Sequence, residues 1–132
     1  MIRTFVFSLI FFVPLLLKSE NIWESSLAEP ALQRGIESLY NYKFDDAIFN
    51  LDSAIKLDAS HPVPLFVLIS AKWLKAQTQI GYMASYDTIR QEVEKTIPIY
   101  KKLIINKPND PELLLYLGST YGMMARTALA NK

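Results

Sequence analysis

Cysteine is absent from this chain of 132 residues, and histidine occurs only once, at His61. Without cysteine the chain can form no disulfide, no thiolate nucleophile and no cysteine-bound zinc site, and it cannot carry the lipid-modified cysteine of a bacterial lipoprotein. A single histidine is poor material for a transition-metal site, and a loop position beside a helix end is its simpler interpretation. We therefore expect no metal and no other cofactor.

Glycine and net charge are also scarce. Of the four glycines, Gly81, Gly118 and Gly122 follow no strand-like segment and so form no phosphate-binding loop. The formal net charge is +1, and the pair Lys101 and Lys102 is too small to bind nucleic acid by counterion release. These absences exclude a nucleic-acid partner from our expectations.

Hydrophobic residues make up 51% of the chain and charged residues 20%, which is the balance of one small globular domain. Part of the apolar content is a run from Phe5 to Leu17, preceded by Arg3 and ended by Lys18. A membrane-spanning helix needs about twenty residues, and this run is shorter. Its layout is typical of a secretory signal peptide.

We therefore predict a signal peptide at residues 1–19, a spacer at residues 20–27, and export to the periplasm or the cell exterior. Two alternatives stay open: an uncleaved membrane anchor formed by residues 5–17, and a buried N-terminal helix. Apart from this run, we expect no contact with a membrane.

The segment from Phe44 to Asp58 is the most strongly patterned part of the remaining chain. Most of its small and apolar residues recur at spacings of three and four, which places them on one face of a helix: Ala47, Ile48, Leu51, Ala54, Ile55 and Leu57. A helix of about four turns is marginal alone and cannot bury such a stripe by itself. The pattern therefore predicts partner helices on at least one side.

Helical periodicity continues before and after this segment. A helix is predicted after Pro30, which suits a first helical turn, and a turn at residues 41–43 joins it to the patterned segment. A second hairpin is predicted from Pro62 to Asp110. Its first helix should run through Gly81, and Thr88 should cap its second helix with Gln91 three residues on.

Pro98 lies inside the second helix of that hairpin and should kink it or leave a hydrogen bond unmade. A last helix is expected from Pro111. The helical domain would then comprise residues 28–132, divided into hairpins 28–61 and 62–110 and a half-unit 111–132.

These hairpins resemble the tetratricopeptide repeat. The first has the repeat's length of about 34 residues, and Ala47, Leu51 and Ala54 match its A-x3-F…A spacing. The last unit matches the opening W-x2-L-G-x2-Y spacing, with leucine for tryptophan, at Leu114, Leu117, Gly118 and Tyr121. The pattern is broken at Ala31 and Arg34, and the middle hairpin is about fifteen residues too long.

The resemblance implies an all-α fold: an antiparallel, tetratricopeptide-like right-handed solenoid of two full hairpins plus one unpaired helix. In this family the first helix of each hairpin lines a concave surface. The resemblance thus implies a groove lined by Leu32, Ile36, Tyr40, Phe66, Ser70, Trp73, Leu115 and Ser119. Trp73 would be its strongest anchor, because tryptophan is enriched in binding hot spots. For Phe66 and Trp73, burial in the core is the competing interpretation.

We find no catalytic constellation and predict that the protein is not an enzyme; a polar cluster in a cleft would contradict this. We predict an exported scaffold, of a bacterial envelope, that binds an apolar or amphipathic peptide segment of another protein. The alternative is a structural subunit that self-associates through its open last helix, with Met123, Met124 and Leu129 at the contact.

Overall fold

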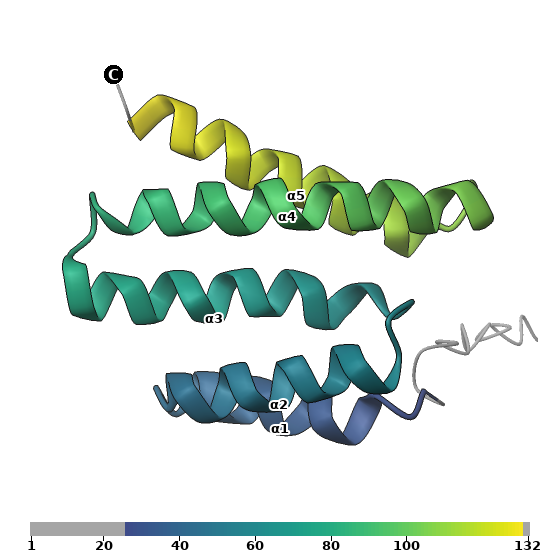
Figure 1. Cartoon of the computed structure of the whole chain (residues 1–132), viewed down its shortest axis with the longest axis horizontal. Coiled ribbons are helices and arrows are strands. Elements are labelled where there is room, and N and C mark those ends of the chain that lie inside the picture. The colour runs from purple at the N-terminus through teal and green to yellow at the C-terminus, as the bar shows by residue number, and fades with distance from the viewer. Residues whose placement is uncertain (1–25, 131–132) are drawn as a thin grey trace, which may run out of the picture.

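The computed structural model describes residues 26–130 and places five α-helices and no strand among them (Figure 1). The helices are α1 (Glu29–Tyr40), α2 (Phe44–Leu57), α3 (Pro62–Ile80), α4 (Ser85–Asn106) and α5 (Pro111–Ala130). The prediction of an all-α fold is confirmed. The proposed signal peptide and most of the spacer lie outside the described residues.

Helix α3 lies at the centre of the arrangement. It packs against α2 on one side and α4 on the other, α1 covers α2, and α5 covers α4 (Figure 1). Helices α1 and α5 also touch α3. Short turns join the consecutive helices, so neighbours along the chain are neighbours in space.

The first core cluster joins α1, α2 and α3. Leu32 of α1, Ala47, Leu51 and Ala54 of α2, and Leu68 of α3 are buried together in it. Most of the amphipathic stripe predicted for the segment from Phe44 to Asp58 is therefore the buried face of α2, but Leu57, a predicted member of it, is 54% exposed. Small residues at this contact let the helices approach closely, and Gly35 of α1 is buried directly against Leu51.

Two further clusters join α3 to α4 and α5. Ile69 packs with Tyr86, Ile89 and Val93, and Leu65 packs with Tyr100 and Leu113. Tyr100 is fully buried, and its hydroxyl donates a hydrogen bond of 2.7 Å to the carbonyl oxygen of Pro62. Burial raises the pKa of Tyr100, so this hydroxyl keeps its proton.

Two predicted features of the second hairpin are wrong. Helix α3 ends at Ile80, and Gly81 follows it with φ 86°, a left-handed backbone that suits glycine. Helix α4 begins at Ser85, so Thr88 lies within its first turn and does not cap it. Pro98 does lie inside α4 and is exposed. Proline has no N–H to donate to the carbonyl oxygen of Glu94, so one helical hydrogen bond is unmade there.

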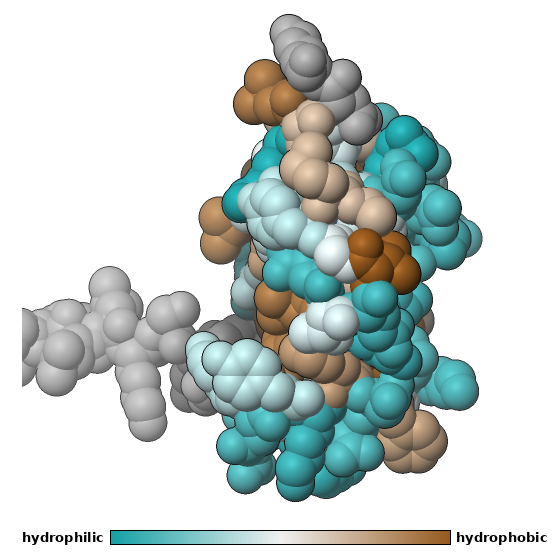
Figure 2. Space-filling model, turned by 90° about the vertical axis from the view of Figure 1, so that its left-hand side faces the viewer, coloured by the Kyte–Doolittle hydropathy of each residue, from teal (hydrophilic) through white to brown (hydrophobic). Residues whose placement is uncertain are grey.

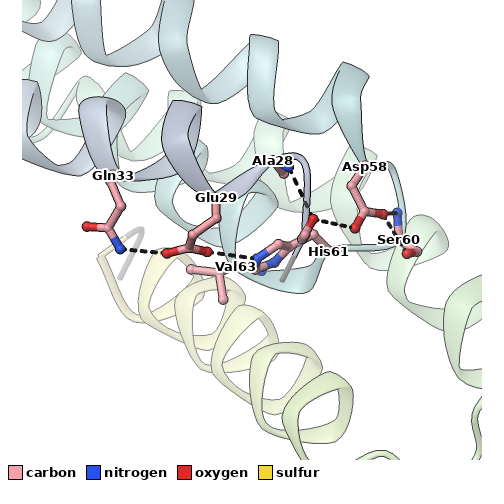
Figure 3. Close-up of polar contacts among 8 residues, drawn as sticks. Ala28, Glu29, Gln33, Asp58, Ser60, His61 and Val63 are labelled. Atoms are coloured by element: carbon pink, nitrogen blue, oxygen red, sulfur yellow. Dashed lines mark hydrogen bonds and ion pairs between the residues drawn. The ribbon is translucent and has the colours of Figure 1, made fainter. Parts of the chain in front are cut away.

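A polar network fixes the junction between α2 and α3 (Figure 3). Asp58 accepts hydrogen bonds from the Ser26 hydroxyl (2.7 Å), the Ser60 hydroxyl (2.6 Å) and the Ser60 backbone N–H (3.0 Å). Partial burial opposes the ionised form, but these hydrogen bonds lower the pKa of Asp58. The carboxylate thus ties the residues before α1 to the end of α2.

His61 caps the start of α3 within the same network. Its Nδ1 accepts from the N–H of Val63 (3.3 Å), and its Nε2 lies 3.6 Å from Oε2 of Glu29 (Figure 3). The ring is almost completely buried. Burial lowers the pKa of His61, although the nearby carboxylates of Glu29 and Asp58 oppose this. The single histidine is therefore a helix cap, as its loop position suggested.

We predict that Gly35→Ala destabilises the protein, because the new Cβ would lie 2.7 Å from Cγ of the fully buried Leu51. Overpacking costs about 1–3 kcal/mol, which outweighs a gain of about 1 kcal/mol in helix propensity. Gly118→Ala on α5 is the matched control, because nothing lies within 4 Å of its Cβ position. It should stabilise the protein by up to about 1 kcal/mol. Urea unfolding followed by circular dichroism measures both, and a Gly35→Ala midpoint above that of the wild type would contradict the predicted steric conflict.

We also predict that the free energy of unfolding falls as the pH is lowered through the range around 6.5. The folded pKa of His61 is lowered, so in that range the unfolded chain binds the extra proton and gains stability relative to the folded chain. His61→Asn keeps a side chain that can cap α3 and should remove most of this dependence. Urea unfolding at pH 7.5 and pH 5.5 gives the comparison; equal pH slopes in the two proteins would show that His61 is not the group responsible.

Candidate functional site

A groove of about 640 Å³ lies where α1, α3 and α5 meet. Its lining is apolar and aromatic with a few hydroxyl groups: Ile36, Leu39, Tyr40, Tyr42, Val63, Phe66, Val67, Ser70, Leu74 and Tyr116. Its volume lies within the range of about 300–1,000 Å³ that is typical of ligand pockets.

Helical periodicity puts these side chains on one surface. Val63, Val67, Ser70 and Leu74 of α3 follow one another at spacings of three and four, and Ile36 and Tyr40 of α1 do the same. The other sides of α3 face α2 and α4, where Leu68, Ile69 and Ala71 are buried. The groove is thus the side of α3 that neither α2 nor α4 covers.

An aromatic pair connects α3 to α5 across the groove. The ring centroids of Phe66 and Tyr116 are 5.5 Å apart and their planes are tilted by 53°, and this distance lies within the range of about 4.5–7 Å that is typical of aromatic pairs. Burial, and secondarily the charge of Glu112, raises the pKa of Tyr116. The Tyr116 hydroxyl therefore stays neutral and can donate a hydrogen bond.

None of the ten lining residues is ionisable near neutral pH. The lining of the groove consequently offers no carboxylate or cation to recognise a charged ligand. What it offers is apolar surface together with the hydroxyl groups of Ser70 and three tyrosines. Such a lining suits the burial of an apolar side of a ligand.

A second, polar hollow of about 380 Å³ adjoins the groove at Tyr42, which lines both. Its other lining residues are Lys43, Phe44, Asp45, Asp46, Lys75, Thr78 and Gln79. Lys75 and Asp45 form an ion pair there between α3 and α2. The surface thus changes from apolar to charged at the turn between α1 and α2.

Four of the eight predicted groove residues line the groove: Ile36, Tyr40, Phe66 and Ser70. Leu32 does not, because it is only 3% exposed within the core between α1, α2 and α3. Leu115 is exposed on α5 and Ser119 is half-buried there, and neither lines the groove.

Trp73 lies at the junction of α3, α4 and α5 instead. Its indole N–H donates to the Ser85 hydroxyl (3.0 Å), and the guanidinium group of Arg126 lies 5.3 Å from the centre of its ring. Arg126 also donates to the hydroxyls of Tyr82 (3.1 Å) and Tyr86 (3.3 Å). Trp73 and Arg126 therefore hold the end of α5 against the turn between α3 and α4.

Of the three residues predicted for self-association, two are partly buried and one is exposed. Met123 and Met124 pack against the cluster of Ile69 and its α4 partners, whereas Leu129 is 69% exposed. Other exposed apolar residues of α5 are Leu114, Leu115 and Tyr121. Figure 2 shows apolar surface among hydrophilic residues at the end of the molecule that holds the turn between α3 and α4, where Ile80 and Met83 are exposed.

Six of the ten lining residues were not among the eight predicted ones: Leu39, Tyr42, Val63, Val67, Leu74 and Tyr116. The helical spacing of Val63, Val67 and Leu74 from Ser70 on α3 could have found three of them. Tyr42 carries no periodic signal because it belongs to a turn.

Within residues 26–130, no three histidine, aspartate or glutamate side chains come together in a group that could hold a metal ion. None of the helices described is long and apolar enough to cross a membrane.

Comparisons of the chain with models of known families, with curated proteins and with solved structures gave no match.

Proposed function

We propose that this protein is a non-catalytic interaction module that buries an apolar or amphipathic segment of a partner protein in the groove between α1, α3 and α5. The observation that carries the proposal is the groove itself: about 640 Å³ lined by ten residues, none of them ionised. Its apolar side chains would leave water when a complementary surface covers them, which favours association.

The exposure of Tyr40 supports this function further. The side chain lines the groove yet is 82% exposed. Large aromatic residues at the surface are frequent anchors of protein interfaces. The exposed surface of Tyr40 can therefore be buried only when a partner protein covers it.

We propose a tetratricopeptide-like arrangement for the helices, with hairpins α1–α2 and α3–α4 and with α5 as an unpaired first helix. Two features favour it. Gly35, at the position of the small residue in such a repeat, receives Leu51 of the second helix, and the groove is lined from α1, α3 and α5 alone apart from the turn residue Tyr42. Solenoids of this kind use such surfaces for binding. The apolar run of residues 5–17 favours export, with cleavage of a signal peptide as the first possibility and membrane anchoring as the second.

Self-assembly through α5 is the second candidate function. Exposed Leu114, Leu115, Tyr121 and Leu129 favour it, and both Gly118 and Gly122 have open space where a Cβ would point. Two helices can approach closely at such glycines.

We predict that a photo-crosslinking amino acid at position 40 forms a discrete adduct with a partner protein in cells, because Tyr40 would lie inside the bound interface. The same substitution at Phe49 is the matched control, since that aromatic side chain is 71% exposed on α2 and does not line the groove. The adduct at position 40 should disappear when Phe66→Glu places a charge in the groove. Identical adducts from positions 40 and 49, or none at position 40, would refute groove binding.

Self-assembly makes a separate prediction for light scattering. If α5 joins two copies, the molar mass should rise with protein concentration, and Tyr121→Glu combined with Leu129→Glu should return it to that of a monomer, because both side chains are exposed. Met123→Glu is unsuitable for this test, since Met123 is half-buried against the cluster of Ile69, Tyr86, Ile89 and Val93. A mass that stays monomeric up to millimolar concentration would rule this candidate out.

A further inference from the structure

Tyr42 adopts a backbone conformation that its residue type does not favour. It sits in the turn between α1 and α2 with φ 58°, and it is the one described residue other than glycine with a positive φ. Side chains make this left-handed conformation unfavourable, so glycine, or less often asparagine, normally occupies it. The presence of tyrosine here therefore requires a reason.

The fold supplies little reason. The turn is closed by backbone hydrogen bonds from Asn41 to Glu37, from Tyr42 to Leu39 and from Lys43 to Ser38, and a glycine at position 42 could form the same bonds. The Tyr42 side chain is 81% exposed, and its ring contact with Phe44 has a centroid distance of 6.2 Å. Residues with strained backbone conformations cluster at functional sites.

The position of Tyr42 indicates what that role is. It lies where the apolar groove meets the polar hollow, and it lines both. Tyr40, the last residue of α1, is also highly exposed and lines the same groove. Tyrosine suits such a boundary, because its ring can cover apolar surface while its hydroxyl faces polar groups.

The backbone of the groove limits what can bind there. Apart from Tyr42, the lining residues lie within α1, α3 and α5, where backbone N–H and C=O groups mostly bond within the same helix. A partner in an extended conformation would bring its own unpaired N–H and C=O groups against a wall that cannot bond them, which is costly. A helical partner satisfies its own backbone and presents only side chains.

We propose that the groove takes the apolar face of an amphipathic α-helix from a partner protein, and that Tyr42 is the residue that selects it at the polar end. This inference rests on the groove-binding function proposed above. The partner's apolar stripe runs along Val63, Phe66 and Val67 and ends at Tyr42. Beyond that point the partner turns polar, because Lys43, Asp45, Asp46 and Lys75 line the adjoining hollow.

Two peptide libraries displayed on phage test the proposal with the full chain as bait. Both contain 16-residue peptides with the same number of apolar residues. One places these residues at i, i+4, i+7 and i+11 of a helix-forming background, and the other alternates them for an extended strand and carries a central proline. Enrichment from the helical library alone is the expected result. Enrichment from the extended library alone would overturn the helical occupant and leave groove binding in place, and enrichment from neither would overturn both.

Variants then assign the role of Tyr42, with the best enriched peptide as the probe in fluorescence anisotropy. Tyr42→Gly should weaken binding about tenfold or more, as loss of a hot-spot aromatic does, while its urea midpoint stays equal or rises because the strain at φ 58° is relieved. Phe49→Ala, which removes an exposed aromatic outside the groove, should leave binding unchanged. A lowered urea midpoint with unchanged affinity would show that Tyr42 serves the fold and would overturn its selecting role. A molar mass that falls in Tyr42→Gly would identify a second copy as the occupant instead.

Discussion

The structure depends on the need to cover α3 on nearly every side. Its sequence is apolar around most of its circumference: Leu68 faces the cluster shared with α1 and α2, Ile69 faces α4, and Leu65 faces Tyr100 and Leu113. A helix that is apolar all round is stable in water only when it is buried. The two neighbouring helices, α2 and α4, supply most of that cover, and α1 and α5 in turn cover them.

The groove is what this arrangement leaves uncovered. Helices α1 and α5 reach the third side of α3 only at its margins, so Phe66 and Val67 remain half-buried beneath them. The hydrophobic effect that drives the packing of the five helices therefore also favours burial of this surface. The groove is, in these terms, a part of the apolar core that no helix covers, which explains why none of its lining residues is ionised.

The sequence allowed the prediction of five helices because each has strong periodicity and is bounded by a turn or proline signal; the α2 stripe of Ala47, Leu51 and Ala54 is an example. The prediction was wrong at Gly81: the apolar pattern continues through this residue, but α3 ends at Ile80. The groove could be predicted only in part. Periodicity states that Leu32 and Trp73 lie on apolar faces, but it cannot state which neighbour covers each face, and both are covered by other helices. Periodicity could not identify Tyr42 at all, because what distinguishes Tyr42 is its backbone angle φ.

Two glycines show how closely residue type and neighbour are coupled. Gly35 on α1 and Gly118 on α5 both lie inside helices, but only Gly35 has a close neighbour at its Cβ position. Leu51 of α2 fills the space beside Gly35, whereas nothing described in residues 26–130 comes within 4 Å of a Cβ built at Gly118. Glycine lowers helix stability, so its presence on α1 is explained by the close approach of α2. No such neighbour lies within 4 Å of the Cβ position of Gly118 among residues 26–130, so close packing does not account for the glycine on α5.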